Sequence, residues 1–563
     1  MKVTSRNVAW IKSLAALFLT SAIITISLGQ YHIRYRPQKI TAFSLPDERD
    51  HTGYSAAERL MMEGVRTGAC DNWQPPTLNR TRMRSGCWKD RWFDQLSGVL
   101  DNWEEEGYSR LSFADNLNKD NHDNLKRLLF CLPHYSLPIS PDAPEECQHQ
   151  NSLTVMLSAH WWTDMARGTG TEPSGEVVHL RPIMQALDRA HYTILTIYHK
   201  DYAGLIKMYS ALPDVISTIW AEDRLVVSCM ADPRCRSDFP QEEKDRIGLS
   251  EVKGLIPSWK MVTLTFWALK SQSSWEWGQR DGDGFTFNTL SHDWIVSPYA
   301  YPGHHYIPFS LEETCSSIPI VPNSKRRDQA VILGKLSKYF YPEKMWGIPP
   351  PIETWLDFEK RTGLSLIANA KAWGPEALGV PAGIDNHGPQ SFDNYTAEVG
   401  RSKMMIALGF PVISPSPYLA LCQGVPVLLP YSGDTPTPAG FDLYEGSLTQ
   451  HGPAALLGEP YVYSYKPHDM DTFWIAVEKA KNNPIDPYIP DEMRLSNVYR
   501  LALQLINRDA RALAQDIKDA RRERGEREDA LVPEYVVETI QKNGWLTRLK
   551  ADGTVSKELV VED

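Results

Sequence analysis

Residues 406–430 read IALGFPVISPSPYLALCQGVPVLLP, and this stretch decides the fold. Its pattern predicts an apolar strand, a Gly-Phe-Pro turn, a proline-rich approach, a short helix and a second strand. Such a turn exposes backbone N–H groups and a helix N-terminus, which bind a diphosphate without a metal. The predicted anion site uses four residues of this stretch: Gly409, Phe410, Pro411 and Pro417.

On both sides of this stretch, short apolar runs alternate with helical segments. The predicted buried strands lie at 153–159, 192–198, 215–221 and 260–266, and again at 329–335, 364–370, 403–409, 424–430 and 461–465. Helices are predicted at 181–190 and 471–483. The alternation predicts an α/β protein with two doubly wound units, and ligands are expected in a cleft at the carboxyl ends of the strands.

Several motifs resemble glycosyltransferase family 18. The stretch 406–430, together with 458–493 (GEPYVYSYKPHDMDTFWIAVEKAKNNPIDPYIPDEM), resembles the C-terminal part of that family. Other matching pieces are Gly175-Glu176, Gly334-Lys335 and Asn386-His387-Gly388, and the similarity runs in order from about residue 153 to 508. The Asp-Pro-Tyr-Ile-Pro run at 486–490 is its most distinctive part.

The resemblance implies a GT-B fold, with two Rossmann-type domains facing a cleft. An acceptor domain is expected at 151–325, a nucleotide-sugar domain at 326–493, and C-terminal helices with a charged tail at 494–563. It implies a Golgi enzyme that transfers N-acetylglucosamine from UDP-GlcNAc to a mannose of N-linked glycans, β-1,6 in linkage, with inversion and without a metal or other cofactor. The implied donor-binding residues are Lys335, Asn386, His387, Gly388, Gly409, Phe410, Pro411 and Pro417.

An inverting transfer needs a carboxylate that takes the proton of the acceptor hydroxyl. The family places this base in the loop after the first strand, which here is 160–176. By spacing, Asp164 is the nearest acid, and Glu172 and Glu176 are rivals; all three acids also fit loop or helix-capping roles. Trp161 and Trp162 are predicted to flank the acceptor sugar.

Two departures from the family bear on the donor site. Where the family has Pro-Leu-Glu-Ala, with a glutamate for the donor ribose, this chain has leucine at position 419, which cannot accept a hydroxyl. The loop 431–444 also lacks the lysine that the family presents to the diphosphate. Either Lys335 or His387 substitutes, or the donor differs, or catalysis has been lost.

Two alternatives to the transferase therefore stay open. One is a catalytically inactive, glycan-binding or scaffold protein. The other is a transferase for another nucleotide sugar, with a metal at Asp281 and Asp283, although the Gly-rich surroundings of these acids favour a simple turn. The pair His304-His305 fits either a donor contact or a structural role.

The N-terminus predicts entry into the secretory pathway. The run 13–29 is apolar and uncharged, and it predicts a signal-anchor behind a cytoplasmic tail at 1–12, with a stem at 30–60 and a single-pass type II orientation in the Golgi membrane. Cleavage after Gly29, which would give a secreted protein, is the alternative. Helical segments at 61–150 suggest a small Cys-containing subdomain or a brace.

Cysteine usage and charge agree with this compartment. Eight cysteines include no C-x-x-C pair, which favours disulfides over a zinc site, and Cys229 and Cys235 are the easiest pair to propose. Two sequons, at Asn79 and Asn394, are compatible with a glycoprotein. The net charge of -11, without a long basic stretch, argues against nucleic-acid partners. The mixed-sign segment 518–529 is predicted to be a solvated helix end or linker.

Overall fold

A computed structural model describes much of the chain between residues 87 and 538. The described ranges are 87–106, 115–134, 143–148, 155–159, 175–198, 201–266, 288–290, 292–298, 305–341, 349–374, 378–409, 414–431, 452–467, 469–529, 531–532 and 537–538. Within these ranges, no helix combines the length and the apolar character that crossing a bilayer requires. The predicted tail, anchor and stem lie outside them.

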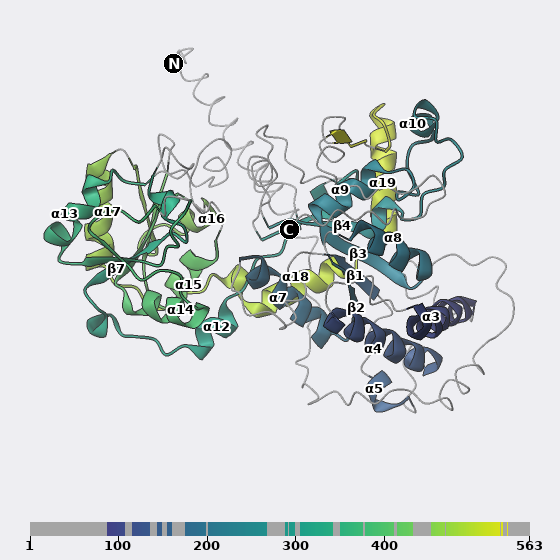
Figure 1. Cartoon of the computed structure of the whole chain (residues 1–563), viewed down its shortest axis with the longest axis horizontal. Helices are drawn as coiled ribbons and strands as arrows, with labels where there is room; N and C mark the ends of the chain where they lie inside the picture. The colour runs from purple at the N-terminus through teal and green to yellow at the C-terminus, as the bar shows by residue number, and fades with distance from the viewer. Residues whose placement is uncertain are drawn as a thin grey trace, which may run out of the picture. The chain divides into compact units, whose positions relative to one another are not determined.

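The first of two parallel sheets is built from the N-terminal half of the chain (Figure 1). Its strand order is β2-β1-β3-β4-β5-β6, and every neighbouring pair is parallel. The strands are β1 (Val155–Ala159), β2 (Thr193–Thr196), β3 (Ile216–Glu222), β4 (Met261–Leu264), β5 (Ile295–Ser297) and β6 (His305–Tyr306). The crossover helices are α7 (Gly175–Arg189), α8 (Tyr202–Ala211) and α9 (Asp223–Ala231). The strand order changes direction between β1 and β3, which makes this the switch point of the sheet.

Helix α4 (Asp115–Cys131) covers the free edge of strand β2. The buried side chain of Asn121 donates to Thr196 O at 2.7 Å and accepts from Thr196 N at 2.8 Å. Asn124 Nδ2 donates to Ile194 O at 2.9 Å. An open strand edge invites pairing with another chain, and these amides occupy its hydrogen-bonding groups. Together with α3 (Cys87–Glu106), whose apolar face shares the same core, α4 braces the first sheet.

The second sheet is also parallel throughout, with strand order β12-β11-β10-β7-β8-β9. The strands are β7 (Gln329–Leu333), β8 (Ser365–Ala368), β9 (Ile384–Asn386), β10 (Met404–Ala407), β11 (Val427–Pro430) and β12 (Val462–Tyr465). The helices that follow its strands include α13 (Glu353–Thr362), α14 (Phe392–Arg401), α15 (Ser416–Cys422) and α17 (Met470–Asn482). Its switch point lies between β7 and β10, two strands that are buried along their whole length.

The predicted apolar runs all contain observed strands, which confirms an α/β fold with two parallel sheets. Strands β5, β6 and β9 were missed because they are only two or three residues long. In β9 the sequence Ile-Asp-Asn is mostly exposed, so it lacks the apolar pattern on which the prediction depends.

The C-terminal helices α18 (Leu495–Ile506) and α19 (Ala510–Glu523) belong to the core of the first sheet. Val498, Ala502 and Leu505 of α18 are buried in one cluster with α7 residues such as Leu180 and Ile183. The chain therefore completes the second sheet and then returns to the first.

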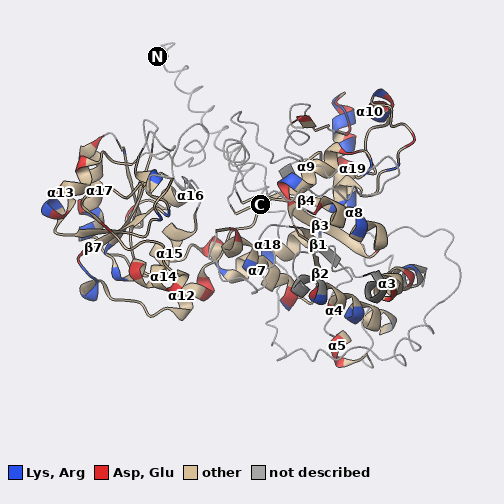
Figure 2. Cartoon of the chain, viewed as in Figure 1, with Lys and Arg blue, Asp and Glu red and all other residues tan. Residues whose placement is uncertain are grey.

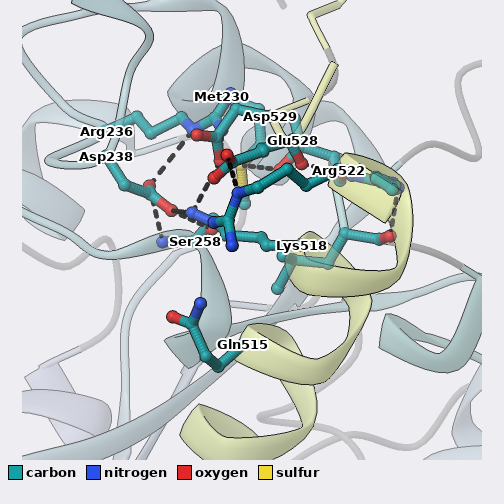
Figure 3. A network of polar contacts seen from close by, with 12 residues as sticks. Met230, Arg236, Asp238, Ser258, Gln515, Lys518, Arg522, Glu528 and Asp529 are labelled. Atoms are coloured by element: carbon teal, nitrogen blue, oxygen red, sulfur yellow. Dashed lines mark hydrogen bonds and ion pairs between the residues drawn. The ribbon is translucent and has the colours of Figure 1, made fainter. Parts of the chain in front are cut away.

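The charged segment 518–529 forms the end of α19 and a tail whose residues 522–527 are exposed, as the sequence predicts, but Lys518 and Asp529 are partly buried and contact the first sheet's unit. Charges of both signs lie along α19 (Figure 2), and several of them contact the first sheet's unit. Arg236, which is fully buried, lies 3.2 Å from Asp238 and 3.1 Å from Asp529, and Lys518 lies 3.0 Å from Asp238 and 2.6 Å from Asp529 (Figure 3). These ion pairs were not predicted because the partners, Arg236 and Asp238, lie almost three hundred residues earlier in the chain.

Three disulfides lie in the described part of the chain: Cys131–Cys147, Cys229–Cys235 and Cys315–Cys422. The predicted pair Cys229–Cys235 is confirmed. The third bridge joins α12 (Glu312–Ser317) to α15. Disulfides are typical of an oxidising compartment, which agrees with the secretory pathway.

Candidate functional site

Most of the predicted donor residues lie where the strands of the second sheet end, which is called its carboxyl edge below. Parallel strands end at the same edge, and Lys335 follows β7, Asn386 ends β9, and Gly409 follows β10. Lys335 and Gly409 therefore flank the switch point, where ligands of such sheets bind. Phe410 and Pro411 lie outside the described residues.

The turn that leads to α15 offers fewer donors than the sequence suggests. Gly409 has a φ of 84°, the left-handed conformation that favours glycine. In the first turn of α15, Ser416 N already donates to Ser414 Oγ at 3.1 Å, Pro417 has no N–H, and Leu419 N donates to Pro415 O at 3.0 Å. A diphosphate at this turn would thus depend on other groups for most of its hydrogen bonds.

The leucine that stands where the family has a glutamate packs into the core from helix α15. Leu419 is 2% exposed, and it belongs to the apolar core of the second sheet. Its neighbour Tyr418 packs edge-on against Phe309, with ring centroids 5.3 Å apart. The position therefore serves the core, and a ribose hydroxyl finds no acceptor on this side chain.

A polar cluster forms around Glu398 of α14, beside the ends of β8 and β9. Glu398 accepts from Asn369 Nδ2 at 2.6 Å, and its other oxygen lies 2.5 Å from His387 Nδ1. His387 Nε2 lies 3.2 Å from Asp385. The Oδ1 atom of Asn369 is buried, and it has no hydrogen-bond partner among the described residues. The cluster thus presents an acceptor and a ring cation at the sheet edge.

Burial opposes the charge on His387, but the carboxylates of Glu398 and Asp385 outweigh it and raise the pKa of His387 above the ordinary 6.5. The imidazolium can therefore persist near neutral pH. Any stability that its pairs provide is present below the unfolded pKa and is lost as the pH rises through the raised, folded one.

Asn386 has a structural task in this region. Its Oδ1 accepts from Ala370 N at 2.9 Å, and its Nδ2 donates to Ala370 O at 3.0 Å. Gly388, with a φ of 70°, donates its N–H to the same Oδ1 at 3.3 Å. Asn386 and Gly388 therefore join the loops after β8 and β9 and hold His387 in place.

The structure adds Lys466 to the candidate cations of this edge. It follows β12 directly, and its Nζ lies 5.8 Å from the ring centroid of Tyr431, which follows β11. Its backbone N–H donates to Thr472 Oγ1 at 2.9 Å. Tyr431 opens the loop in which the family lysine was expected, so a cation is available nearby after all. The signal in the sequence was a lysine directly after a predicted strand.

The first sheet contributes two acids at its carboxyl edge. Glu176 lies in the first turn of α7, where the ring of Phe266 packs so closely on Gly175 that an added Cβ would lie 2.4 Å from it. Glu222 ends β3 and is 5% exposed. The end of β1, which the segment with Asp164 follows in sequence, and Glu222 flank the switch point of the first sheet. Sequence reasoning missed Glu222, although it directly follows a predicted strand.

Several predicted residues cannot be placed. Outside the described residues lie Trp161, Trp162, Asp164, Glu172, Asp281, Asp283 and His304. His305 is described: its Nε2 lies 3.0 Å from Arg508, and burial together with this guanidinium lowers its pKa to about 4. That environment favours the structural role. In the described ranges, no group of three His, Cys, Asp or Glu side chains could hold a metal ion.

A cavity of about 360 Å³ lies beside α7, α12 and α14. Arg181, Gln185, Glu313 and Asp393 supply its polar lining, and none of the predicted site residues lines it. The predicted donor residues therefore belong to the sheet edge and not to this cavity.

Sequence comparison finds distant relatives. No protein-family model matches the chain. It is 24% identical over 230 residues to human alpha-1,6-mannosylglycoprotein 6-beta-N-acetylglucosaminyltransferase A, and 28% identical over 120 residues to the mouse B enzyme. These matches cover 38% and 20% of this chain, and only 29% and 15% of the relatives' lengths.

Structural comparison finds low similarity to two enzymes. A UDP-GlcNAc 2-epimerase from Neisseria meningitidis, bound to UDP-GlcNAc, has 10% identity and a TM-score of 0.32, covering 62% of this chain and 99% of that one. A mutant O-GlcNAc transferase from Thermobaculum terrenum has 13% identity and a TM-score of 0.28, covering 77% of each chain. By sequence, the chain is a distant relative of the alpha-1,6-mannosylglycoprotein 6-beta-N-acetylglucosaminyltransferases A and B.

Proposed function

We propose that the protein is a glycosyltransferase that binds a nucleotide sugar at the carboxyl edge of its second sheet. The observation that carries the proposal is the row of polar side chains along this edge: Lys335 follows β7 at the switch point between β7 and β10, the pair of His387 and Glu398 lies beyond β8, and Lys466 follows β12 at the other end of the sheet. Fully parallel sheets bind ligands at this place. The distant sequence similarity favours UDP-GlcNAc as donor and a mannose of an N-linked glycan as acceptor.

In the proposed donor site, the cations neutralise the diphosphate and the Glu398 cluster recognises hydroxyl groups. Lys335 is exposed, while Lys466 is half-buried against Tyr431. Asp385 of this cluster is exposed, and its carboxylate can accept a hydrogen bond from a sugar or ribose hydroxyl. These groups take over the roles that Leu419 and the loop 431–444 cannot fill, and no metal is needed for charge neutralisation.

In the proposed transfer, an acid at the first sheet's switch point removes the proton of the acceptor hydroxyl. The acceptor oxygen then forms a bond to the anomeric carbon as the bond to the UDP oxygen breaks, which inverts the anomeric configuration. Asp164 remains the first candidate, with Glu172 and Glu176 as rivals, and Glu222 joins them because it flanks the same switch point.

The test is calorimetric titration of the full-length protein in detergent with UDP-GlcNAc, in EDTA and in Mn²⁺, combined with an assay of transfer to a mannose-terminated N-glycan. Binding and turnover in EDTA are expected. Binding without turnover would instead support the second candidate, a glycan-binding or scaffold protein, which the burial of Leu419 favours. Turnover only in Mn²⁺ would support a different, metal-dependent transferase.

Placement in the Golgi membrane through residues 13–29 is part of the proposal. Expression of the full chain with a C-terminal tag should give a membrane-bound protein whose tag is protected from protease in sealed vesicles. Release of the tagged protein into the medium would show that the signal is cleaved.

Replacing Lys466 with methionine is expected to weaken UDP-GlcNAc binding by about 10- to 100-fold, because a charge-assisted contact contributes about 1.5 to 3 kcal/mol. The measurement is the calorimetric Kd. Lys479→Met is the matched control, since Lys479 lies at the far end of α17 and pairs with Glu459 at 2.7 Å. Equal affinities for Lys466→Met and wild type would remove Lys466 from the site.

Donor affinity is expected to fall as the pH rises through the raised pKa of His387, because the ring then loses its positive charge. Titrations with UDP-GlcNAc between about pH 6 and 9 measure this slope, because the diphosphate is esterified at both ends and keeps a constant charge over this range. His387→Gln should bind more weakly at the acidic end and show a flat profile. An unchanged slope in this variant would mean that another group titrates.

A further inference from the structure

An exposed tryptophan lies at the carboxyl edge of the second sheet. Trp373 follows β8, and among the residues whose side chains the structure describes it is the only exposed Phe, Tyr or Trp, at 41%. Its backbone is fixed: Trp373 N donates to Ser337 Oγ at 3.0 Å, and Leu378 N donates to Trp373 O at 3.1 Å. A large flat apolar side chain is thus held in solvent on an ordered loop, beside the place where ligands of this sheet bind.

Three lysines lie on the same two loops. Lys338 Nζ lies 4.7 Å from the ring centroid of Trp373. Lys335 and Lys371 are exposed and lie on adjacent segments, because Lys371 N donates to Lys335 O at 3.0 Å and Ser337 N donates to Lys371 O at 3.0 Å. The loops after β7 and β8 therefore present one indole and three ammonium groups together.

These lysines form no ion pair with any residue in the described ranges. Elsewhere in the second unit, Lys403 pairs with Asp328 and Lys479 with Glu459, whereas Lys325 and Lys360 also form no ion pair in the described ranges. Lysine and arginine alternate with acidic residues over much of the described chain (Figure 2), and the net charge is -11. Three ammonium groups on two adjacent loops, with no acidic partner in the described ranges, create a local positive charge in an acidic protein, and this favours an anionic ligand.

We propose that Trp373, Lys335, Lys338 and Lys371 form a subsite for an anionic saccharide. The indole stacks on the apolar face of a pyranose ring, and the ammonium groups neutralise a phosphate or carboxylate on that sugar. The subsite rests on the proposed transferase function for its role beside the transfer site. Its anion comes either from the phosphate of the nucleotide sugar or from an acidic acceptor glycan.

The test uses the full-length protein in detergent and four probes: N-acetylglucosamine, N-acetylglucosamine 1-phosphate, UDP-GlcNAc and a sialylated oligosaccharide. N-acetylglucosamine 1-phosphate or the sialylated probe is expected to bind at least tenfold more tightly than the neutral sugar. Trp373→Ala should lose at least tenfold of that affinity, Trp373→Phe should keep most of it, and Lys338→Met should remove the preference for the anion. Trp474→Ala is the matched control, because Trp474 also lies under a cation, with Arg361 Cζ 4.2 Å from its ring centroid, but on α17.

The outcomes separate the two sources and the two proposals. A Trp373-dependent loss for both phosphate probes assigns the anion to the donor, and a loss for the sialylated probe alone assigns it to the acceptor. Equal binding of neutral and anionic sugars, or unchanged affinities in Trp373→Ala, would overturn the subsite. If UDP-GlcNAc neither binds nor reacts while Trp373-dependent binding of an acidic sugar persists, the subsite stands and the transferase does not.

Discussion

Replacing Asp164 with asparagine is expected to lower the rate of sugar transfer by about two to four orders of magnitude, the range that a general base contributes. The amide cannot take the proton of the acceptor hydroxyl, so the hydroxyl must attack unassisted. The affinity for UDP-GlcNAc should stay unchanged, because the base does not contact the diphosphate. Steady-state transfer to a mannose-terminated glycan and calorimetric binding measure the two effects separately.

The other three candidate bases supply the controls for this prediction. Glu172→Gln, Glu176→Gln and Glu222→Gln are expected to keep most of the rate if Asp164 is the base. A variant that loses both rate and donor affinity reports damage to the fold, which thermal melting would reveal. Full activity in Asp164→Asn together with a selective loss of rate in Glu222→Gln would move the base to the end of β3.

Replacing Asp238 with alanine is expected to destabilise the first sheet's unit by about 3 to 5 kcal/mol, the range for removing one partner of a buried ion pair. Arg236 is fully buried, and it would lose its contact with Asp238 while it keeps the contact with Asp529. Lys518 would lose one of its two carboxylates at the same time. Urea unfolding followed by tryptophan fluorescence measures the change.

The same network predicts how stability depends on pH. Burial opposes the charge on Asp238, but Arg236 and Lys518 lower its pKa to about 2, below the ordinary 3.8. Its contribution is therefore fully present above about pH 4, and it is lost as the pH falls toward 2. Glu526→Ala is the control, because its pair with Arg524 is solvent-exposed, and no measurable change is expected. A similar loss of unfolding free energy in both variants would show that the buried network contributes no more stability than an exposed ion pair.

The fold could be predicted because its central strands carry their own signal. Strands β7, β10 and β11 are continuous apolar runs buried on both faces, the pattern that parallel sheets require. The return of α18 to the first sheet could not be predicted, since its apolar face would fit either unit equally well. For the same reason, nothing in the segment 518–529 indicates that its charges pair with Arg236 and Asp238.

Only part of the candidate site could be predicted from the sequence. Lys335 was chosen at the end of a predicted strand and His387 from the resemblance to the family, and both lie at the carboxyl edge of the second sheet. Lys466 and Glu222 were missed, although each adjoins a strand end, because only the strand order shows that β3 flanks a switch point, and only the structure shows that Lys466 lies beside Tyr431. The role of Asn386 depends on its distance to Ala370, which the sequence does not contain.

The return of α18 also constrains how the chain folds during synthesis. The first unit is translated first, yet Val498, Ala502 and Leu505 reach its core only after the second unit has been made. The second sheet can close its core as it is translated, whereas the earlier unit keeps part of its apolar surface open until nearly the whole chain has left the ribosome. The unit that is translated first is then the more aggregation-prone one during synthesis. It would also need protection by chaperones for longest.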